Sequence, residues 1–197
     1  MSKRISLMSS LILSTAFFAG AAHAGLVGVK DIRVSQGSGD PNIQVTELQA
    51  FETKTGRNVA LSSNGTVATA SSNWSWDSFA GKAIDGQYAN QNFPNMWHSS
   101  GGSLNDWLNI SFSSAVNLDS ITMYGRSECC SFRDVYNLAF YGVDGGLLYT
   151  ATLDASSGNH MGSISLPTAD VPEPASVALL GLGVAGLMAS RRKQVKK

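Results

Sequence analysis

Apolar and polar side chains alternate in short segments through most of the chain, and this alternation restricts it to an all-β fold. Leu108, Ile110 and Phe112 share one phase of such a segment, whereas Trp107 has the opposite phase. A period of two is typical of a strand with one buried face. Outside the two termini, no window of eleven or more residues has the 3.6-residue period of an amphipathic helix. We therefore expect an antiparallel β domain.

The same alternation recurs on both sides of this segment, in phases that we expect to face the core. Its members are Ile43, Val45 and Phe51; Ile121 and Met123; Val135, Ala139, Tyr141 and Val143; and Leu147, Tyr149, Ala151 and Leu153. Turn-forming clusters separate the segments at residues 37–41, 62–65, 144–146 and 156–159. Short strands joined by Gly- and Ser-rich turns predict a β-sandwich or a jelly roll.

Residues 1–24 have the layout of an export signal. Lys3 and Arg4 precede an apolar stretch, and a small-x-small cleavage site ends at Ala24. A first transmembrane anchor is the alternative, but the cleavage site favours a signal peptide. The exported domain, residues 25–170, is then expected to fold where disulfides are permitted.

Residues 171–197 have the layout of a second targeting segment. Val-Pro-Glu-Pro at residues 171–174 precedes an apolar run over residues 175–190 and a basic end. As a helix the run spans roughly 23 Å, short of the ~30 Å hydrocarbon core, but the basic cluster behind it favours a transmembrane sorting helix. The segment resembles the PEP-CTERM sorting tail of Gram-negative bacteria. This resemblance implies an exosortase as partner and a cell-envelope or surface destination, with anchoring in the membrane at least before processing.

Charge is divided unevenly between these parts. The whole chain has 14 basic and 14 acidic residues, but residues 25–170 contain seven basic and thirteen acidic ones, a net charge near −6. An acidic domain is a poor partner for nucleic acid. The chain has two cysteines, so a disulfide-dense miniature scaffold is excluded.

Several segments between residues 30 and 166 resemble the coagulation-factor 5/8 type C, or discoidin, family of galactose-binding-like jelly rolls. They are residues 58–60 and 68–72, the A-x-D-G loop at residues 83–86, the W-H-S and W-L-x-I segments at residues 97–99 and 107–110, and residues 124–133. The last resembles the fucose-binding lectins, in which R-x-D-C-C-x-x-R lines the sugar pocket. The resemblance implies a discoidin-like jelly-roll β-sandwich that binds carbohydrate.

One segment departs from the family's order. Residues 43–51 resemble the family's final strand but precede its first. We infer a circular permutation in which the last two strands come first, which is tolerable where the termini of a jelly roll lie close together. This order requires residues 43–51 to lie beside the loop at residues 81–88.

The permuted strand carries Glu47, which is in phase with Ile43 and Val45 and is therefore expected to point inward. A buried carboxylate needs a cation or several hydrogen-bond donors. The family resemblance implies Ca²⁺, which takes six to eight oxygen ligands. These would be the carboxylates of Asp85 and Glu47, the Ser99 hydroxyl, and the carbonyls of Lys82, Gln87 and Thr46. Alternatively, Asp85 only caps a turn and a bulge directs Glu47 outward.

Cys129 and Cys130 are adjacent. Their Cα atoms are ~3.8 Å apart, closer than the 4.4–6.8 Å usual for disulfides, but export favours a bond between them. The ring is too small to stabilise the chain much, whereas its flat apolar face suits the C–H face of a sugar. Two free thiols near a loop tip are the alternative.

Arg126 and Arg133 flank the cysteines. Guanidinium groups donate paired hydrogen bonds to vicinal hydroxyls and keep their charge. Glu128 replaces the family's Asp and is expected to orient one of them through a salt bridge. Alternatively, both are ordinary surface arginines paired with Glu128 and Asp134.

His98 and two tryptophans complete the candidate site. The family's sugar-binding His falls near residues 101–102, where this chain has none, so His98 either reaches the sugar or has only a structural role. Trp74 and Trp76, in a Ser- and Asn-rich loop, either form a stacking rim or pack against the domain.

We expect no enzymatic activity. His98 and His160, the histidines that follow the signal, lack a metal-ligand spacing, and there is no G-x-S-x-G or P-loop. The adjacent cysteines lack the C-x-x-C redox spacing. The sequence therefore predicts an exported carbohydrate-binding protein, supported by Ca²⁺, with a glycan or extracellular polysaccharide as partner. The alternative is a structural envelope or matrix protein whose jelly roll no longer binds sugar.

Overall fold

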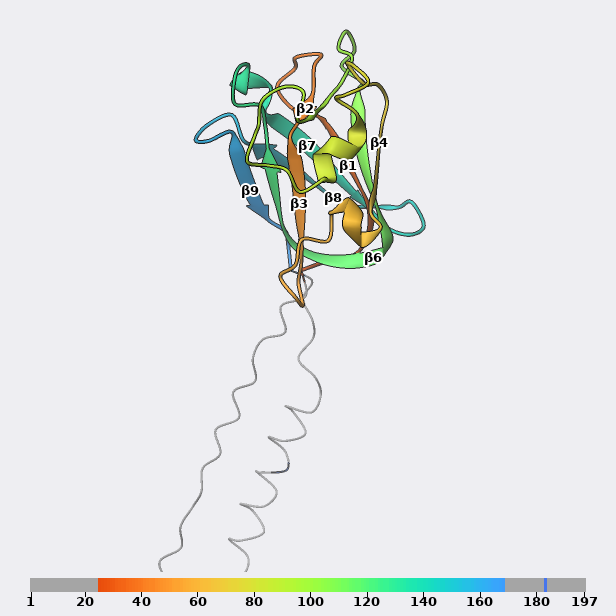
Figure 1. Ribbon diagram of the computed structural model, residues 1–197. Helices are drawn as coiled ribbons and strands as arrows, with labels where there is room; N and C mark the ends of the chain where they lie inside the picture. Colours follow the sequence, from red (N-terminus) through yellow and green to blue (C-terminus); the bar gives the residue numbers. More distant parts are fainter. Residues whose placement is uncertain (1–24, 169–182, 184–197) are drawn as a thin grey trace, which may run out of the picture.

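The computed structural model describes residues 25–168 and Gly183, and this part of the chain is all-β, as predicted (Figure 1). The strands are β1 (Leu26–Gln36), β2 (Gln44–Val45), β3 (Glu47–Glu52), β4 (Val67–Ala70), β5 (Trp97–His98), β6 (Trp107–Tyr124), β7 (Val135–Tyr141), β8 (Leu147–Asp154) and β9 (Met161–Ser165). Three short 3-10 helices lie in the connections, η1 (Ser62–Asn64), η2 (Ala80–Ile84) and η3 (Ser131–Arg133).

The two predicted targeting segments, the signal peptide and the sorting tail, are, apart from Gly183, not among the described residues. The signal peptide over residues 1–24 lies outside the described residues, and so does the tail helix over residues 175–190, apart from Gly183. Within residues 25–168 and Gly183, none of the helices has the length and hydropathy needed to cross a bilayer.

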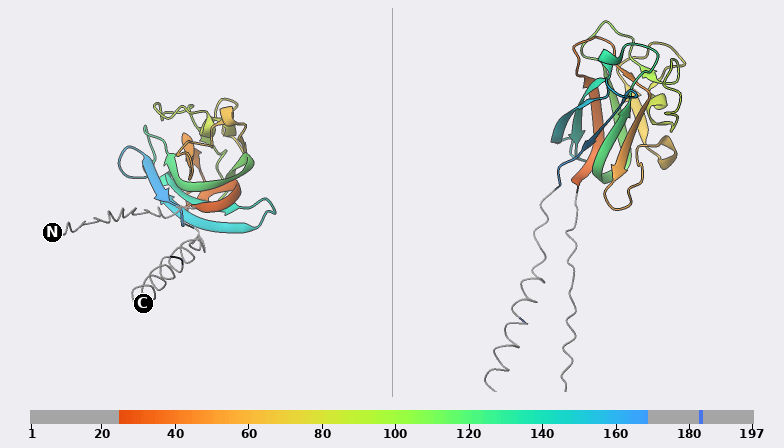
Figure 2. Two further views of the ribbon diagram at one scale, coloured as in Figure 1. Left: turned by 90° about the horizontal axis from the view of Figure 1, so that it is seen from below. Right: turned by 90° about the vertical axis from the view of Figure 1, so that its left-hand side faces the viewer.

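The long strand β6 connects the two parts of the sheet, because its two halves pair with different strands. Its first half pairs antiparallel with β4 and β1, and β7 and β8 continue the sheet beyond β1. Its second half pairs antiparallel with β3 and with β9. Both parts contribute to one hydrophobic core, an arrangement consistent with a β-sandwich (Figure 2).

The core side chains follow the predicted alternation in most strands. Leu108, Ile110 and Phe112 are buried, while Trp107 on the opposite face is not. The predicted residues Ile43, Val45, Ile121, Met123 and Leu153 are buried as well. Each such side chain contributes roughly 1.5–3 kcal/mol through removal of its surface from water. The prediction is wrong for Phe51, because Leu48 and Ala50 are the buried apolar residues of β3, and for Leu147, which is exposed.

The predicted phase of β7 is wrong. Tyr136, Leu138 and Phe140 face the core, whereas the expected inward residues 135, 139 and 141 have the opposite phase. Nearly every side chain of this strand is apolar or aromatic, so the sequence pattern has no polar face to distinguish. The register with β1 decides the phase, because Leu138 pairs with Val34 and Phe140 with Ile32, both core residues.

The two ends of the domain leave it at the same edge. Leu26 pairs with Leu118, and Leu166 N–H donates to Asp119 O at 2.8 Å. Leu118 lies where β6 passes from its pairing with β1 to its pairing with β3. The loops after β1 and before β7 lie at the opposite edge, which is the upper edge in Figure 1. We call this upper edge the loop edge.

Candidate functional site

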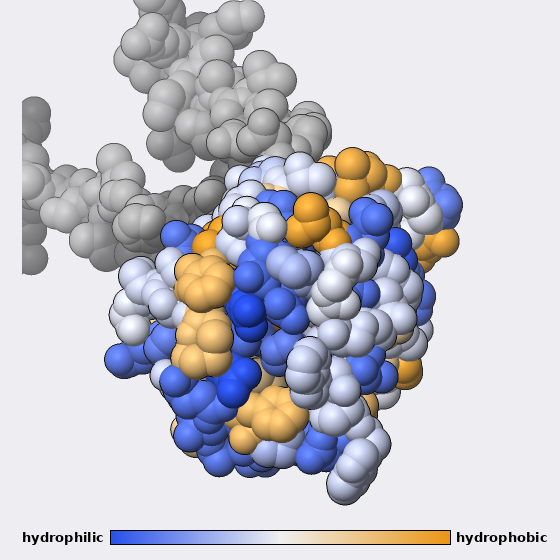
Figure 3. All heavy atoms as spheres, turned by 90° about the horizontal axis from the view of Figure 1, so that it is seen from above, coloured by the Kyte–Doolittle hydropathy of each residue, from blue (hydrophilic) through white to orange (hydrophobic). Residues whose placement is uncertain are grey.

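A cavity of about 450 Å³ opens at the loop edge. It is lined by Asn42, Trp74, Phe93, His98, Arg126, Cys129, Cys130 and Arg133. The structure thus brings together all five residues predicted to contact a sugar, together with one of the two predicted rim tryptophans. Figure 3 looks down onto this edge and shows apolar patches separated by strongly hydrophilic side chains.

The connection between β6 and β7 carries four of the lining residues. Cys129 and Cys130 form the predicted disulfide, with their Cα atoms 3.7 Å apart. Cys130 adopts a left-handed backbone conformation with φ 64° and leads directly into η3. This change of direction folds the connection back on itself, so that Arg126 and Arg133 reach the same cavity from either side of the disulfide.

The fully buried side chain of Asp134 holds this connection in place. Its carboxylate accepts hydrogen bonds from Gln44 Nε2 and His160 Nδ1, both at 3.1 Å, and from Arg126 N–H at 3.4 Å. Gln44 Nε2 also lies 3.3 Å from Cys130 O, so one amide joins the carboxylate to the disulfide. Among the described residues, the ion-pair partner of Asp134 is His160. The alternative in which Asp134 pairs with an arginine side chain is therefore wrong.

Each arginine of the cavity is paired with a carboxylate. Arg126 Nε donates to Glu128 Oε1 at 2.8 Å, the salt bridge that the sequence predicted. Arg133 Nε lies 3.1 Å from Asp40 Oδ1 but without hydrogen-bond geometry, so this N–H remains an unpaired donor. Two positive and two negative charges therefore stand around the cavity, and their formal sum is zero.

Both carboxylates stay ionised at neutral pH. Slight desolvation acts to raise the pKa of Glu128, but hydrogen bonds from Phe93 N–H and Arg126 outweigh it and lower the pKa. Desolvation likewise opposes ionisation of Asp40, but hydrogen bonds from Asn42 and the charge of Arg133 lower its pKa below the ordinary value. The charge balance is therefore maintained around pH 7.

His98 lines the cavity and is held by its own backbone neighbour. The residue is 5% exposed, and its Nδ1 lies 2.7 Å from Ser99 O. Because a carbonyl only accepts, Nδ1 carries the proton of the neutral ring and Nε2 has the free lone pair. Burial lowers the pKa of His98, and the charges of Arg126 and Arg133 lower it further. The structure places His98 at the cavity, and its contact with a ligand stays a prediction.

Aromatic rings form two walls of the cavity. The rings of Trp74 and His98 have centroids 5.4 Å apart, and Phe93 meets His98 edge-on at 6.5 Å. Phe93 and Asn42 also line the cavity but were not predicted from the sequence, because both lie in irregular loops without a recognisable motif. Trp76 does not line the cavity and is 89% exposed.

A pair of carboxylates lies at the β3–η2 contact. Glu47 is fully buried, so the alternative in which a bulge directs it outward is wrong. Its Oε2 accepts from Gly86 N–H at 3.1 Å, whereas Oε1 has no hydrogen-bond partner. Burial raises the pKa of Glu47 to about 8, and the charge of Asp85 adds to the effect. Asp85 also caps its turn by accepting from Gln87 N–H at 2.9 Å.

The other predicted calcium ligands are only partly gathered here. The Ser99 hydroxyl accepts from Ile43 N–H at 3.0 Å, so its hydrogen bond links it to Ile43 and not to Glu47 or Asp85. The pairing of Gln44 with His98 sets this register. The described residues contain no cluster of three or more His, Cys, Asp or Glu. A cation at the pair would therefore depend on backbone carbonyls.

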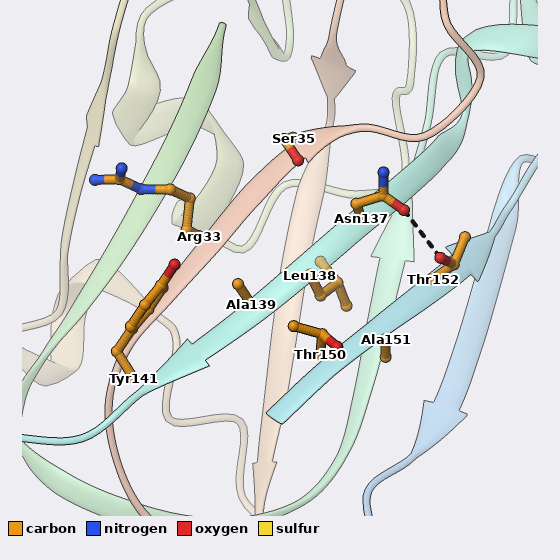
Figure 4. A pocket seen from close by; sticks show the side chains of 9 residues that line it. All are labelled: Arg33, Ser35, Asn137, Leu138, Ala139, Tyr141, Thr150, Ala151 and Thr152. Carbon is orange, nitrogen blue, oxygen red and sulfur yellow. Dashed lines mark hydrogen bonds between the residues drawn. The ribbon is translucent and has the colours of Figure 1, made fainter. Parts of the chain in front are cut away.

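A larger hollow of about 540 Å³ lies on the outer face of β1, β7 and β8, away from these residues (Figure 4). Its floor is Ala139, whose short side chain lies between its register partners Arg33 and Thr150. Arg33 is the one charged residue of the lining, and its guanidinium stacks 4.4 Å from the Trp107 ring. Because charged groups, an imidazole and a disulfide converge at the loop edge, we take the smaller cavity as the candidate site.

Comparison with known proteins identifies the tail of the chain. Residues 170–193 match the PEP-CTERM protein-sorting motif, which confirms the predicted sorting segment. No curated protein and no solved structure matched the chain. The sorting motif marks the chain as an exported protein that an exosortase sorts to the cell envelope or surface.

Proposed function

We propose that the exported domain is a lectin-like module that binds a neutral glycan in the loop-edge cavity. The observation that carries this proposal is the convergence of two carboxylate-paired arginines, a neutral imidazole and a vicinal disulfide in one cavity. The resemblance of residues 124–133 to the fucose-binding lectins supports the same ligand class.

Each group in the cavity suits one feature of a sugar ring. The guanidinium groups donate to hydroxyl oxygens, and His98 Nε2 accepts from a hydroxyl. The Cys129–Cys130 ring and the walls of Trp74 and Phe93 offer apolar surface to C–H groups. Sites of this kind combine an apolar lining with a few placed polar groups.

The charge balance favours a neutral over an acidic sugar. A uronate or sulfate would need an uncompensated cation, but the charges of Arg126 and Arg133 are already offset by Glu128 and Asp40. The net charge of about −6 over residues 25–170 also repels acidic polymers at long range.

The proposed activity is binding without catalysis. A general acid at neutral pH needs a raised pKa, whereas Asp40 and Glu128, the carboxylates paired with the cavity arginines, both have lowered pKa values.

The proposed fold is a circularly permuted discoidin-like jelly roll. Its support is the contact that the permuted order requires: Gly86 N–H, in the A-x-D-G loop, donates to Glu47 of the displaced strand at 3.1 Å.

Calcium fits the carboxylate pair. Glu47 is a buried carboxylate with one unpartnered oxygen beside a second carboxylate, a donor set that favours a hard cation. Asp85 and Glu47 would hold the ion with the carbonyls of Thr46, Lys82 and Gln87. When bound, the ion would neutralise both carboxylates and fix residues 80–88 against β3.

A glycan array probed with the full chain, with and without EDTA, tests the binding proposal. We expect neutral glycans to be retained by the wild type and lost in Arg126→Ala. Arg33→Ala removes the same charge from the outer sheet face and is expected to bind as the wild type does. A blank array in both conditions contradicts the proposal and favours the structural envelope protein.

A further inference from the structure

Trp76 is the most exposed aromatic side chain of the described residues, at 89%. Its neighbour Trp74 is 58% exposed, although it also lines the cavity. Single exposed apolar side chains are common on soluble domains, so the position of Trp76 beside the cavity, and not its exposure alone, carries the argument.

Trp76 lies in a turn, residues 75–78, that is closed by hydrogen bonds among its own residues. Ser75 N–H donates to the Ser78 hydroxyl at 3.2 Å, and the hydroxyls of Ser75 and Ser78 lie 3.0 Å apart. The Ser75 hydroxyl also donates to Asp77 Oδ1 at 2.5 Å. Trp76 therefore stands at the tip of a four-residue turn that is hydrogen-bonded on both sides of it.

This turn is attached to the cavity at both ends. Trp74 N–H donates to His98 O at 2.8 Å, and His98 N–H donates to Ser78 O at 3.3 Å. The backbone of one cavity residue thus holds the segment on either side of Trp76. Since Trp76 follows Trp74 by two residues, their Cα atoms are at most roughly 7 Å apart. The backbone of Trp76 is therefore held close to two residues that line the cavity, Trp74 and His98.

We propose that Trp76 is the platform for a further sugar residue, so that the site takes a neutral oligosaccharide rather than a single sugar. This inference rests on the proposed function of the cavity. A terminal sugar occupies the cavity, and the chain leaves it past Trp74 to stack on Trp76. An indole face accepts the C–H face of a pyranose, and the adjoining Ser75 and Asp77 are polar partners for its hydroxyls.

The setting of Trp76 favours a sugar over an apolar protein surface. Its immediate neighbours Ser75 and Asp77 are polar, and the segment continues with Ser71, Ser72 and Asn73 on the other side of Trp74. A protein interface of useful affinity requires a contiguous desolvated patch of many side chains. A single aromatic face among hydroxyls matches one amphipathic ring.

The test compares ligand length rather than ligand identity. The full chain is titrated with L-fucose, with D-galactose, and with neutral trisaccharides that end in either sugar, for the wild type, Trp76→Ala and Trp76→Phe. We expect Trp76→Ala to leave the monosaccharide Kd unchanged and to raise the trisaccharide Kd roughly five- to tenfold, as the loss of one stacking contact predicts. Trp76→Phe keeps a ring and is expected to retain most of the affinity. Val143→Ala, at an exposed apolar residue of the β7–β8 turn, controls for general surface effects.

The outcomes separate this inference from the proposed function. A wild-type protein that binds monosaccharide and trisaccharide equally tightly overturns the role of Trp76 but leaves the cavity as a sugar site. So does a trisaccharide Kd that is unchanged in Trp76→Ala. If the wild type binds none of the sugars, the proposed function is itself overturned, and the platform with it.

Discussion

Arg126 Nε and Glu128 Oε1 lie 2.8 Å apart, and the same carboxylate oxygen accepts the Phe93 N–H at 3.0 Å. One oxygen therefore orients a guanidinium and fixes the loop that supplies an aromatic wall of the cavity. Glu128 also compensates the positive charge of Arg126. The cavity is therefore expected to prefer neutral over acidic glycans, and this preference can be measured.

Glu128→Gln is expected to shift the cavity toward acidic ligands. The amide keeps the size of the side chain but leaves Arg126 uncompensated, so the formal charge of the cavity rises to +1. Binding of uronate- or sulfate-bearing glycans should increase roughly three- to tenfold relative to neutral glycans, as an electrostatic contribution of about 1 kcal/mol predicts. Array signals for matched neutral and acidic glycans measure the ratio. Glu52→Gln is the control, and an unchanged ratio in Glu128→Gln contradicts the charge-balance argument.

Replacing both cysteines by serine is expected to separate stability from binding. A loop of two residues restricts the unfolded chain little, about 1 kcal/mol, so the Tm should fall by only a few degrees. Affinity for sugar should fall at least about tenfold because the apolar face of the ring is lost. Calorimetry and titration on the same samples give both values. Full affinity in the double variant excludes a binding role for the disulfide.

Glycan binding is expected to weaken in acid through His98. Protonation removes the Nε2 acceptor and adds a third positive charge beside Arg126 and Arg133. Because the folded-state pKa of His98 is lowered, the neutral ring persists down through the ordinary histidine value of ~6.5, and binding falls only below it. The free energy of unfolding should fall over the same range, since the unfolded state then binds the proton more tightly.

The Kd measured across this range, for the wild type and His98→Gln, checks the assignment. The amide of Gln keeps an acceptor that does not titrate, so its profile should be flat. Asp40 and Glu128 have lowered pKa values and remain charged over most of the range. A wild-type profile as flat as that of His98→Gln refutes the role of the imidazole.

Calcium is expected to raise the Tm of the wild type but not that of Glu47→Gln. At a concentration 100 times Kd, a ligand that binds only the folded state adds about 2.7 kcal/mol, roughly 5–10 °C for a domain of this size. Glu52→Gln, at the other glutamate of β3, should keep the full response. In EDTA, Glu47→Gln should be at least as stable as the wild type. With its pKa raised to about 8, the buried Glu47 must take up a proton on folding at neutral pH, whereas the amide need not. An equal rise in Tm with calcium in Glu47→Gln and Glu52→Gln would contradict a calcium site at Glu47.

The sequence predicts those parts of the site that depend on local spacing. Arg126, Glu128, Cys129, Cys130 and Arg133 occupy one eight-residue segment, and the structure places all of them at the cavity or paired to it. Alternation likewise predicts the inward face of β6, where polar and apolar residues are sharply separated.

Long-range pairing decides the rest. Asp40 and Asn42 reach the cavity through the loop after β1, and nothing in their local sequence indicates Arg133 as a partner. Ser99 was assigned to the calcium site because of its motif, but the pairing of Gln44 with His98 places it against Ile43.

Both ends of the domain leave beside residues 118 and 119, and β1 runs from this edge to the loop edge. The cavity therefore lies at the end of the domain remote from the residues that lead to the sorting tail. Under the proposed function, many copies sorted into one envelope would offer many such cavities. A polysaccharide with a repeating unit could then engage several copies at once, and the resulting avidity would exceed the affinity of any single cavity without contact between neighbouring domains.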